Sequence, residues 1–155
     1  MKINELLKAE LIEPNLTLTE KNAVLEYLVK LATPYIKEKS TVDVDKVLQA
    51  LRDREAMTST GIGNGIAIPH AKVEGLNQII LLFARSPNGV DFQALDDAPV
   101  QLIFLAIAPP DIAADYLKLL AAISALLKKA KNRNALLKAN TKAEIMAVIK
   151  AGEST

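Results

Sequence analysis

Three compact apolar runs in the middle third of the chain limit what it can fold into. They cover residues 66–68, 79–84 and 100–107 and are bounded by Gly, Asn and Pro. Each run is too short for a buried helix, and it lacks the polar alternation of a strand with one face in water. We therefore predict mostly buried strands that are covered on both faces. This pattern indicates a single α/β domain over residues 1–155, with helices on both sides of a small sheet.

Helical periodicity precedes these runs. Residues 3–11 carry apolar side chains at the spacing of a short amphipathic helix. Thr19 is placed to cap a second helix over residues 24–35, which we expect Pro34 to kink or end. Asp43 has the position of an N-cap for a third helix.

Turn and helix signals organise the rest of the chain. Residues 86–89 (Ser-Pro-Asn-Gly) predict a turn, and residues 90–92 a short extra strand. Apolar spacing predicts a helix over residues 116–127 that ends in lysines. A capping box at residues 141–144 begins a last helix. We expect residues 152–155 to be loosely held.

Composition excludes several classes of function. The chain has no cysteine, so disulfides, thiol nucleophiles and thiolate metal sites are absent. A net charge of +1 and few aromatic residues argue against a nucleic-acid partner. Glu5 and Glu10 interrupt the apolar stretch that a signal peptide would need, and no run approaches the length of a membrane span. We therefore expect a cytoplasmic protein without direct membrane insertion.

A segment rich in glycine and hydroxyl groups lies directly before the first apolar run. Glycines leave backbone N–H groups unshielded, and such loops can hold anions such as phosphate. The segment is neither a P-loop, because no Lys-Ser/Thr pair follows, nor a dinucleotide fingerprint, because it precedes a strand instead of opening a helix. The alternative is a connection that only turns the chain. The candidate residues are Thr58, Ser59, Thr60, Gly61, Gly63 and Gly65.

His70 is the single histidine of the chain, and it stands after Pro69 at the end of the first apolar run. A neutral imidazole has one ring nitrogen with a free lone pair, which makes it a candidate nucleophile beside an anion-binding loop. The alternative is a structural or surface histidine. One histidine without cysteines would leave a metal site to be completed by carboxylates, and few lie near His70 in sequence, so we predict no metal and no cofactor.

The stretch from Arg54-Glu55 through Ser59-Thr60-Gly61-Ile62-Gly63-Asn64-Gly65-Ile66-Ala67-Ile68-Pro69-His70 resembles the active-site signature of a known family. The family comprises the IIA components of the phosphotransferase system (PTS) of the fructose, mannitol and nitrogen-regulatory class, EIIA type 2. The order of elements and the segment Gly89-Val90-Asp91-Phe92 extend the resemblance over roughly residues 3–150. It implies a mixed sheet flanked by helices.

The resemblance also implies a chemistry. His70 would accept a phosphoryl group, on the ring nitrogen farther from the backbone, from a phosphohistidine of the carrier HPr or its nitrogen-branch counterpart. It would pass the group to a cysteine of a separate IIB domain. Arg54 would donate charge-assisted hydrogen bonds to the phosphoryl oxygens. Without the motif, we would interpret Arg54 as a solvated residue at a helix end. Ser59, Thr60 and the glycines would add donors, and the acceptor that orients the second ring nitrogen is not identified.

This chain departs from the family at Tyr116, where many members carry a second histidine. A tyrosine hydroxyl can donate a hydrogen bond to a phosphoryl oxygen but is not cationic at neutral pH. The alternative for Tyr116 is packing in the core. Ile62 and Ile66 are candidates for an apolar docking rim, with the core again the alternative. Two functions stay open: phosphoryl relay for sugar uptake, and nitrogen-branch regulation in which the phosphorylation state of His70 controls protein binding.

Overall fold

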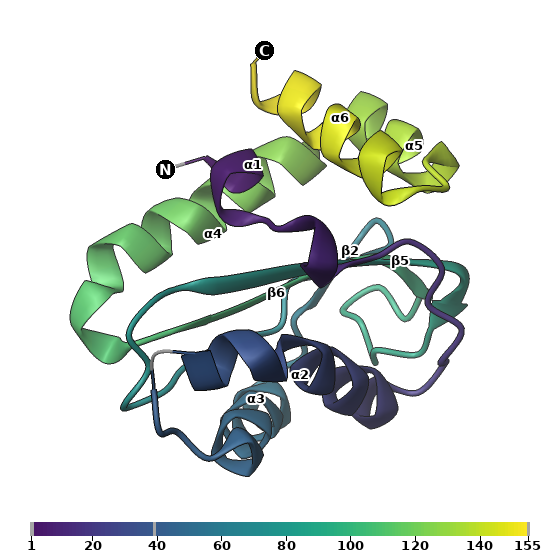
Figure 1. Ribbon diagram of the computed structural model, residues 1–155. Helices are drawn as coiled ribbons and strands as arrows, with labels where there is room; N and C mark the ends of the chain where they lie inside the picture. Colours follow the sequence, from purple (N-terminus) through teal and green to yellow (C-terminus); the bar gives the residue numbers. More distant parts are fainter. Residues whose placement is uncertain (1, 39, 155) are drawn as a thin grey trace.

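A mixed sheet of six strands lies at the centre of the part of the chain that this computed structural model describes, residues 2–38 and 40–154 (Figure 1). The strand order is β1-β5-β6-β3-β2, and β4 also pairs with β6. β5 and β6 are antiparallel, whereas β3 and β4 both run parallel to β6. The strands are β1 (Ile12–Glu13), β2 (Gly61–Gly63), β3 (Ile66–Ala67), β4 (His70–Lys72), β5 (Ile80–Val90) and β6 (Val100–Ala108). The mixed sheet implied by the family resemblance is confirmed.

Helices cover both faces of the sheet, as predicted (Figure 1). α2 and α3 lie on one face, and the remaining α-helices lie on the other. Successive residues of β6 explain why its run is apolar throughout: Ile103 and Leu105 face the α2–α3 core, while Phe104 packs in the opposite core against Phe83. The helices are α1 (Ile3–Leu6), α2 (Lys21–Glu38), α3 (Val44–Met57), α4 (Ala113–Lys128), α5 (Ala130–Lys138) and α6 (Lys142–Glu153), with short 3-10 helices η1 (Ala9–Leu11) and η2 (Pro110–Ile112).

Two of the three predicted helix caps are confirmed. The carboxylate of Asp43 accepts a hydrogen bond from the N–H of Asp45, and the hydroxyl of Thr141 accepts one from the N–H of Glu144. The prediction for Thr19 is wrong, because the carboxylate of Glu20 caps α2 through the N–H of Ala23 at 2.8 Å. A longer acidic side chain one residue later therefore takes over the capping role.

Two predicted chain breaks do not end their elements. Pro34 lies inside α2, which continues to Glu38, because buried Ile36 holds the last turn on the core and the proline itself is exposed. Residues 86–89 do not reverse the chain either. They form a bulge inside β5, where the pairing with β6 shifts register between Arg85 and Val90. The turn residues bend the strand locally without terminating it.

The segment predicted as a short extra strand, residues 90–92, is divided between other structures. Val90 is the last residue of β5 and pairs with Val100, Asp91 forms a single bridge to Glu20, and Phe92 is buried in the α2–α3 core. The separate strand expected from the sequence is therefore not formed.

The chain ends also differ from expectation. Residues 3–11 form two short pieces, α1 and η1, instead of one helix. The expected loose tail is wrong for the described residues 152–154, because α6 extends to Glu153. The carboxylate of Glu153 accepts hydrogen bonds from the N–H groups of Ile3 at 2.6 Å and Asn4 at 2.8 Å. Thr155 lies outside the described residues.

α5 was not predicted at all, because its polar sequence gives a weak apolar stripe. Among residues 2–38 and 40–154, none of the helices combines the length and the apolar character that crossing a bilayer requires.

Candidate functional site

The glycine-rich segment forms a β-hairpin that leads to His70. β2 and β3 are antiparallel, and the two residues between them, Asn64 and Gly65, have positive φ values of 57° and 75°. Two positive φ values in a two-residue loop are typical of the turn that fits the twist of a hairpin. An Asn-Gly pair is the strongest short sequence signal for this turn, so the hairpin could have been predicted.

His70 lies beside the central strand of the sheet. β3 and β4 both pair with β6 and are separated by Ile68 and Pro69. Ala106 of β6 donates its N–H to the carbonyl of Pro69 at 3.0 Å and stands opposite His70. The imidazole is half-buried. Pairing with β6 therefore fixes the backbone of His70, while part of the residue stays accessible.

The carbonyl of Ile68 determines which nitrogen of His70 carries the proton. Nδ1 lies 2.7 Å from this oxygen, and a carbonyl oxygen only accepts hydrogen bonds. In the neutral imidazole, Nδ1 therefore holds the hydrogen and Nε2 holds the lone pair. Sequence reasoning left this acceptor unidentified, because any residue type supplies a backbone carbonyl.

Tyr116 comes to His70 from the first turn of α4. The two ring centroids lie 6.1 Å apart, with the planes tilted by 56°. The side chain is 3% exposed, and its hydroxyl has no hydrogen-bond partner within the described chain. Burial raises the pKa of Tyr116, while the positive charge of Arg54 acts in the opposite direction. The hydroxyl is therefore a protonated donor without an acceptor, an arrangement that costs about 1–3 kcal/mol.

Arg54 stands in the last turn of α3 and is half-buried. One guanidinium nitrogen, Nη1, donates to the carbonyl of Thr58 at 2.9 Å, and its charge acts on Tyr116. The structure thus brings three predicted site residues together from α3, β4 and α4. A cation, an imidazole and a buried hydroxyl donor form the chemical centre of the site.

Several polar groups of the predicted phosphate-binding loop are engaged with protein acceptors. The hydroxyl of Ser59 donates to the carbonyl of Phe92 at 2.7 Å and accepts the N–H of Gly61 at 3.1 Å. A Cβ at Gly61 would lie 2.7 Å from the Cβ of Ala94, so the close approach of these segments requires glycine. These contacts anchor the hairpin to residues 92–94.

Carboxylates accept hydrogen bonds from two further N–H groups of the same loop. Asp96 accepts the N–H of Asn64 at 3.2 Å. Glu55 accepts both the N–H and the hydroxyl of Thr60. Gly63 and Gly65 have φ values of 98° and 75°, which favour glycine over any residue with a side chain. In this structure the loop is a braced hairpin whose shape depends on its glycines.

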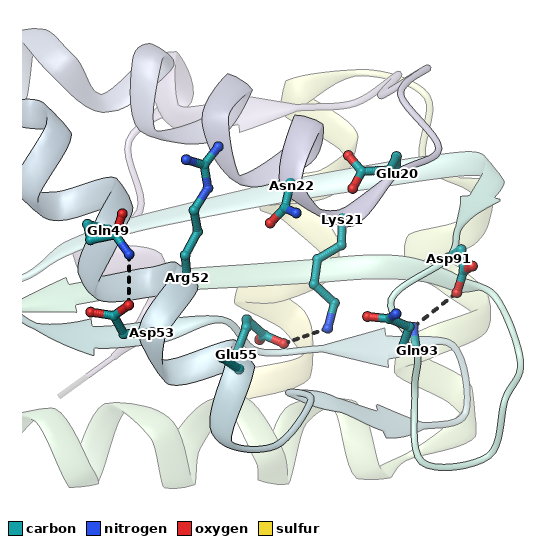
Figure 2. A pocket seen from close by; sticks show the side chains of 10 residues that line it. Glu20, Lys21, Asn22, Gln49, Arg52, Asp53, Glu55, Asp91 and Gln93 are labelled. Carbon is teal, nitrogen blue, oxygen red and sulfur yellow. Dashed lines mark hydrogen bonds and ion pairs between the residues drawn. The ribbon is translucent and has the colours of Figure 1, made fainter.

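A buried ion pair supports the start of the hairpin. Lys21 reaches from the first residue of α2 to Glu55 on α3, with Nζ 3.0 Å from Oε2, and the side chains are 11% and 5% exposed (Figure 2). The Lys21 ammonium also lies 5.1 Å from the ring centre of Phe92. Sequence reasoning missed this pair. A signal existed, because Glu55 continues the buried stripe of Val47 and Leu51 at helical spacing.

A polar cleft of about 470 Å³ lies between α2, α3 and residues 91–93, and the Lys21–Glu55 ion pair forms part of its wall (Figure 2). Within the cleft, the side-chain amide of Gln49 donates a hydrogen bond to the carboxylate of Asp53. Arg52 points away from the Lys21–Glu55 pair (Figure 2). His70 is not among the described residues that line the cleft, so the cleft is separate from the imidazole site. The lining residues are Glu20, Lys21, Asn22, Gln49, Arg52, Asp53, Glu55, Ala56, Asp91 and Gln93.

Some exposed apolar side chains belong to the same elements as the predicted site residues, or to segments bonded to them. Ile62 is 48% exposed at the hairpin, as expected for a rim, whereas Ile66 is buried in the core. Three other large apolar residues of the described chain are exposed close in sequence or structure to site residues. Met57 ends α3 after Arg54, Leu117 follows Tyr116, and Leu95 donates its N–H to the carbonyl of Gly61. We call Met57, Ile62, Leu95 and Leu117 the apolar rim.

Known proteins resemble this chain in sequence and in fold. A family model described as "Phosphoenolpyruvate-dependent sugar phosphotransferase system, EIIA 2" matches residues 5–152. A PTS system fructose-specific EIIA component of Haloferax volcanii is 37% identical over 129 residues, which cover 83% of this chain and 82% of the relative. A nitrogen regulatory protein of Bradyrhizobium diazoefficiens is 38% identical over 128 residues, covering 83% of this chain and 81% of the relative.

A solved structure extends the similarity to three dimensions. The crystal structure of nitrogen regulatory protein IIA-Ntr from Neisseria meningitidis has a TM-score of 0.87 and 28% sequence identity, covering 95% of this chain and 98% of that chain. By sequence, the chain is about equally similar to a relative named as a fructose-specific EIIA component and to one named as a nitrogen regulatory protein.

Proposed function

Because the chain belongs to the EIIA type-2 family of the phosphoenolpyruvate-dependent sugar phosphotransferase system, we propose that it is a phosphocarrier in which His70 receives and passes on a phosphoryl group. The donor is a phosphohistidine of HPr or of its nitrogen-branch counterpart. The acceptor is a cysteine of a separate IIB domain, and the relay leads to sugar uptake. The carrier is one domain over residues 1–155 and works in the cytoplasm.

The observation that carries this proposal is the hydrogen bond from Nδ1 of His70 to the carbonyl of Ile68. It leaves the lone pair of Nε2 free to attack the phosphorus of the donor in line. The new N–P bond forms at Nε2 as the N–P bond of the donor breaks, and its electron pair returns to the donor imidazole. A cysteine thiolate later attacks the same phosphorus, and the bond to Nε2 breaks. Such transfer needs positioning and charge stabilisation above all.

Arg54 and Tyr116 supply the stabilisation in this proposal. The guanidinium of Arg54 donates charge-assisted hydrogen bonds to the equatorial phosphoryl oxygens. The buried hydroxyl of Tyr116 donates a hydrogen bond to one of these oxygens, which is then the acceptor that this hydroxyl otherwise lacks. Ser59, Thr60, Gly61, Gly63 and Gly65 hold the hairpin beside the phosphoryl group, since several of their polar groups are bonded within the protein.

The apolar rim supports transient docking of the two partners. Its four residues are exposed and lie next to site residues in sequence, or on segments bonded to them, which supports an apolar surface that a carrier protein can cover and then release. Both the donor and the acceptor must approach Nε2, so each would use this surface in turn.

Nitrogen-branch regulation is the second candidate function. Two observations favour it: the high structural similarity to a nitrogen regulatory protein, and Tyr116 in the place where many family members carry a second histidine. A neutral phenol stabilises a phosphoryl group less than an imidazolium does, which suits slow turnover. The phosphorylation state of His70 would then control the binding of other proteins.

One experiment tests the proposal and separates the two functions. The protein is incubated with phosphoenolpyruvate, enzyme I and HPr, with and without a IIB domain from the same genome, and its intact mass is measured. We expect one acid-labile phosphoryl group, absent in His70→Ala, that disappears when IIB is added. A phosphoryl group that persists with IIB supports regulation. No phosphorylation by HPr, and none in a parallel incubation with the nitrogen-branch carrier, would overturn the proposed function.

A further inference from the structure

Glu55 is a buried carboxylate that touches no part of the His70 side chain in the described contacts, yet it is linked to His70 by consecutive hydrogen bonds. Its oxygens accept the N–H and the hydroxyl of Thr60 and the ammonium of Lys21. With a residue exposure of 8%, it is one of few buried charged groups in the described chain. A carboxylate placed so deeply and bonded so fully holds a fixed geometry.

The first link runs from Glu55 to the loop between α3 and β2. Thr60 is held at its N–H and its hydroxyl, so both its backbone and its side chain are fixed. The neighbouring residue Arg54 donates to the carbonyl of Thr58. Consecutive residues of α3 thus hold two loop residues, and the direction of the Arg54 side chain depends on the same turn.

The second link runs from Thr60 to His70. The carbonyl of Thr60 accepts the N–H of Ile68 at 3.1 Å, and the carbonyl of Ile68 lies 2.7 Å from Nδ1 of His70. Residue by residue, the chain of contacts is Glu55 to Thr60, Thr60 to Ile68 and Ile68 to His70. Each contact is a hydrogen bond between groups in a sheet or a buried loop, where a displacement is passed to the next group.

Lys21 makes this arrangement possible electrostatically. Its ammonium neutralises the Glu55 carboxylate, and its position over the ring of Phe92 fixes it against the same loop region that anchors Ser59. Without Lys21, a buried carboxylate would remain unpaired and would be strongly unfavourable. The pair therefore joins the first turn of α2 to the end of α3.

We propose that Glu55, paired with Lys21, is a positioning residue that acts through Thr60 and Ile68 to hold the tautomer and orientation of His70 and the direction of Arg54. This inference rests on the proposed phosphocarrier function. It predicts that disturbing Glu55 or Thr60 misplaces the nucleophile without changing any group that contacts the phosphoryl group.

The test uses the full chain and variants that keep the fold. Glu55→Gln alone leaves Lys21 unpaired and can unfold the protein, so it is combined with Lys21→Met to remove both charges. Thr60→Val removes only the hydroxyl group that donates a hydrogen bond to Glu55. Glu26→Gln is the matched control, because Glu26 is exposed and its only described ion pair is a 3.5 Å contact with Arg52.

Two readouts are measured for each folded variant. The first is the rate of phosphoryl acceptance from HPr, separated into kcat and KM. The second is the ¹⁵N spectrum of the imidazole, which is simple to assign because His70 is the single histidine. We expect Glu55→Gln/Lys21→Met and Thr60→Val to lower kcat about tenfold or more, with little change in KM, because a small misplacement of a reacting group costs this much. We also expect the imidazole nitrogens to shift toward a mixture of tautomers.

The proposal is overturned if both variants melt like the wild type, accept phosphate at the wild-type rate and leave the imidazole spectrum unchanged. Glu55 would then be a structural residue alone. A wild-type protein that accepts no phosphoryl group would contradict the proposed function, while the imidazole spectra of the unphosphorylated variants would still decide the positioning role.

Discussion

The carbonyl oxygen of Ile68 lies 2.7 Å from Nδ1 of His70, two residues further along the chain. This contact directs the reactive lone pair to Nε2. We expect the phosphoryl group to form on Nε2 and not on Nδ1, which ¹⁵N and ³¹P spectra of the phosphorylated protein distinguish. His70→Ala should retain the fold and lose all phosphorylation. A phosphoryl group on Nδ1 would mean that the contact with Ile68 breaks before transfer.

Arg54→Lys should slow phosphoryl transfer about tenfold or more, because a lysine cannot reproduce the forked donors of a guanidinium. The free energy of unfolding should change by less than about 1 kcal/mol, since Arg54 is half-buried and its described hydrogen bond is to one carbonyl. Arg52→Lys, two residues earlier on α3, is the matched control and should transfer at the wild-type rate. Equal rates for both variants would return Arg54 to the role of a solvated helix-end residue.

Tyr116→Phe should affect the unphosphorylated and the phosphorylated protein in different ways. In the unphosphorylated protein it removes a buried hydroxyl that has no described partner, so stability should stay equal or rise by about 1 kcal/mol. In the phosphorylated protein the substitution removes a hydrogen-bond donor to the phosphoryl group. The equilibrium of phosphoryl transfer with HPr should therefore shift toward phosphorylated HPr. Urea unfolding and the phosphorylated fraction at equilibrium measure the two effects. A Phe variant that is less stable yet equally phosphorylated would place Tyr116 in the core alone.

Tyr116→His tests the same position in the opposite direction. An imidazole can become cationic beside a phosphoryl group, which a phenol at neutral pH cannot. We expect faster phosphoryl acceptance and a larger phosphorylated fraction than in the wild type. The intact-mass time course measures both, and unchanged acceptance would argue against any contact between residue 116 and the phosphoryl group.

Alkaline pH should destabilise the wild type more than Tyr116→Phe. Burial raises the pKa of Tyr116 above the ordinary value of 10.0, so the folded protein keeps the phenol proton while the unfolded chain loses it. The free energy of unfolding is therefore unaffected by this ionisation below about pH 10, and it falls as pH rises from there toward the folded pKa, at up to about 1.4 kcal/mol per pH unit. Urea unfolding of both proteins at pH 8 and pH 11 measures this difference. A gap that is the same at both pH values would contradict the burial of the phenol.

Local signals predicted the parts of the fold that depend on local chemistry. Asp43 and Thr141 cap helices through bonds to residues two or three positions away, so their neighbours in sequence were sufficient. Pro34 and residues 86–89 carry equally clear local signals, but tertiary contacts outweighed them. Buried Ile36 keeps the last turn of α2 in place, and β6 continues to pair with β5 beyond the bulge.

In the candidate site too, some residues could be predicted from the sequence and others depend on tertiary contacts. His70, Arg54 and Tyr116 could be named from the sequence because the family resemblance marks their positions. The group that orients His70 could not, because it is a backbone carbonyl. Lys21 and Glu55 are 34 positions apart, and only the packing of α2 on α3 brings them together. The buried stripe that includes Glu55 was the available clue.

The contact between the two ends of the described chain gives a last prediction. Glu153 in the final turn of α6 accepts the N–H groups of Ile3 and Asn4 and the side-chain amide of Asn4, so it serves as the cap of α1. A carboxylate that accepts hydrogen bonds at a helix N-terminus contributes more than a neutral acceptor does. Glu153→Ala should therefore lower the free energy of unfolding by about 1–3 kcal/mol.

Hydrogen exchange at Asn4 should also become faster in this variant, because its N–H loses its acceptor while the sheet and the His70 site stay intact. Glu74→Ala, at an exposed position between β4 and β5, is the control and should change stability by less than about 0.5 kcal/mol. Phosphoryl acceptance should be unchanged in both variants, since Glu153 lies beside the C-terminal half of α4, whereas Tyr116 lies in its first turn. A Glu153→Ala protein with wild-type stability and wild-type exchange at Asn4 would show that the end of α6 is as loosely held as its sequence suggests.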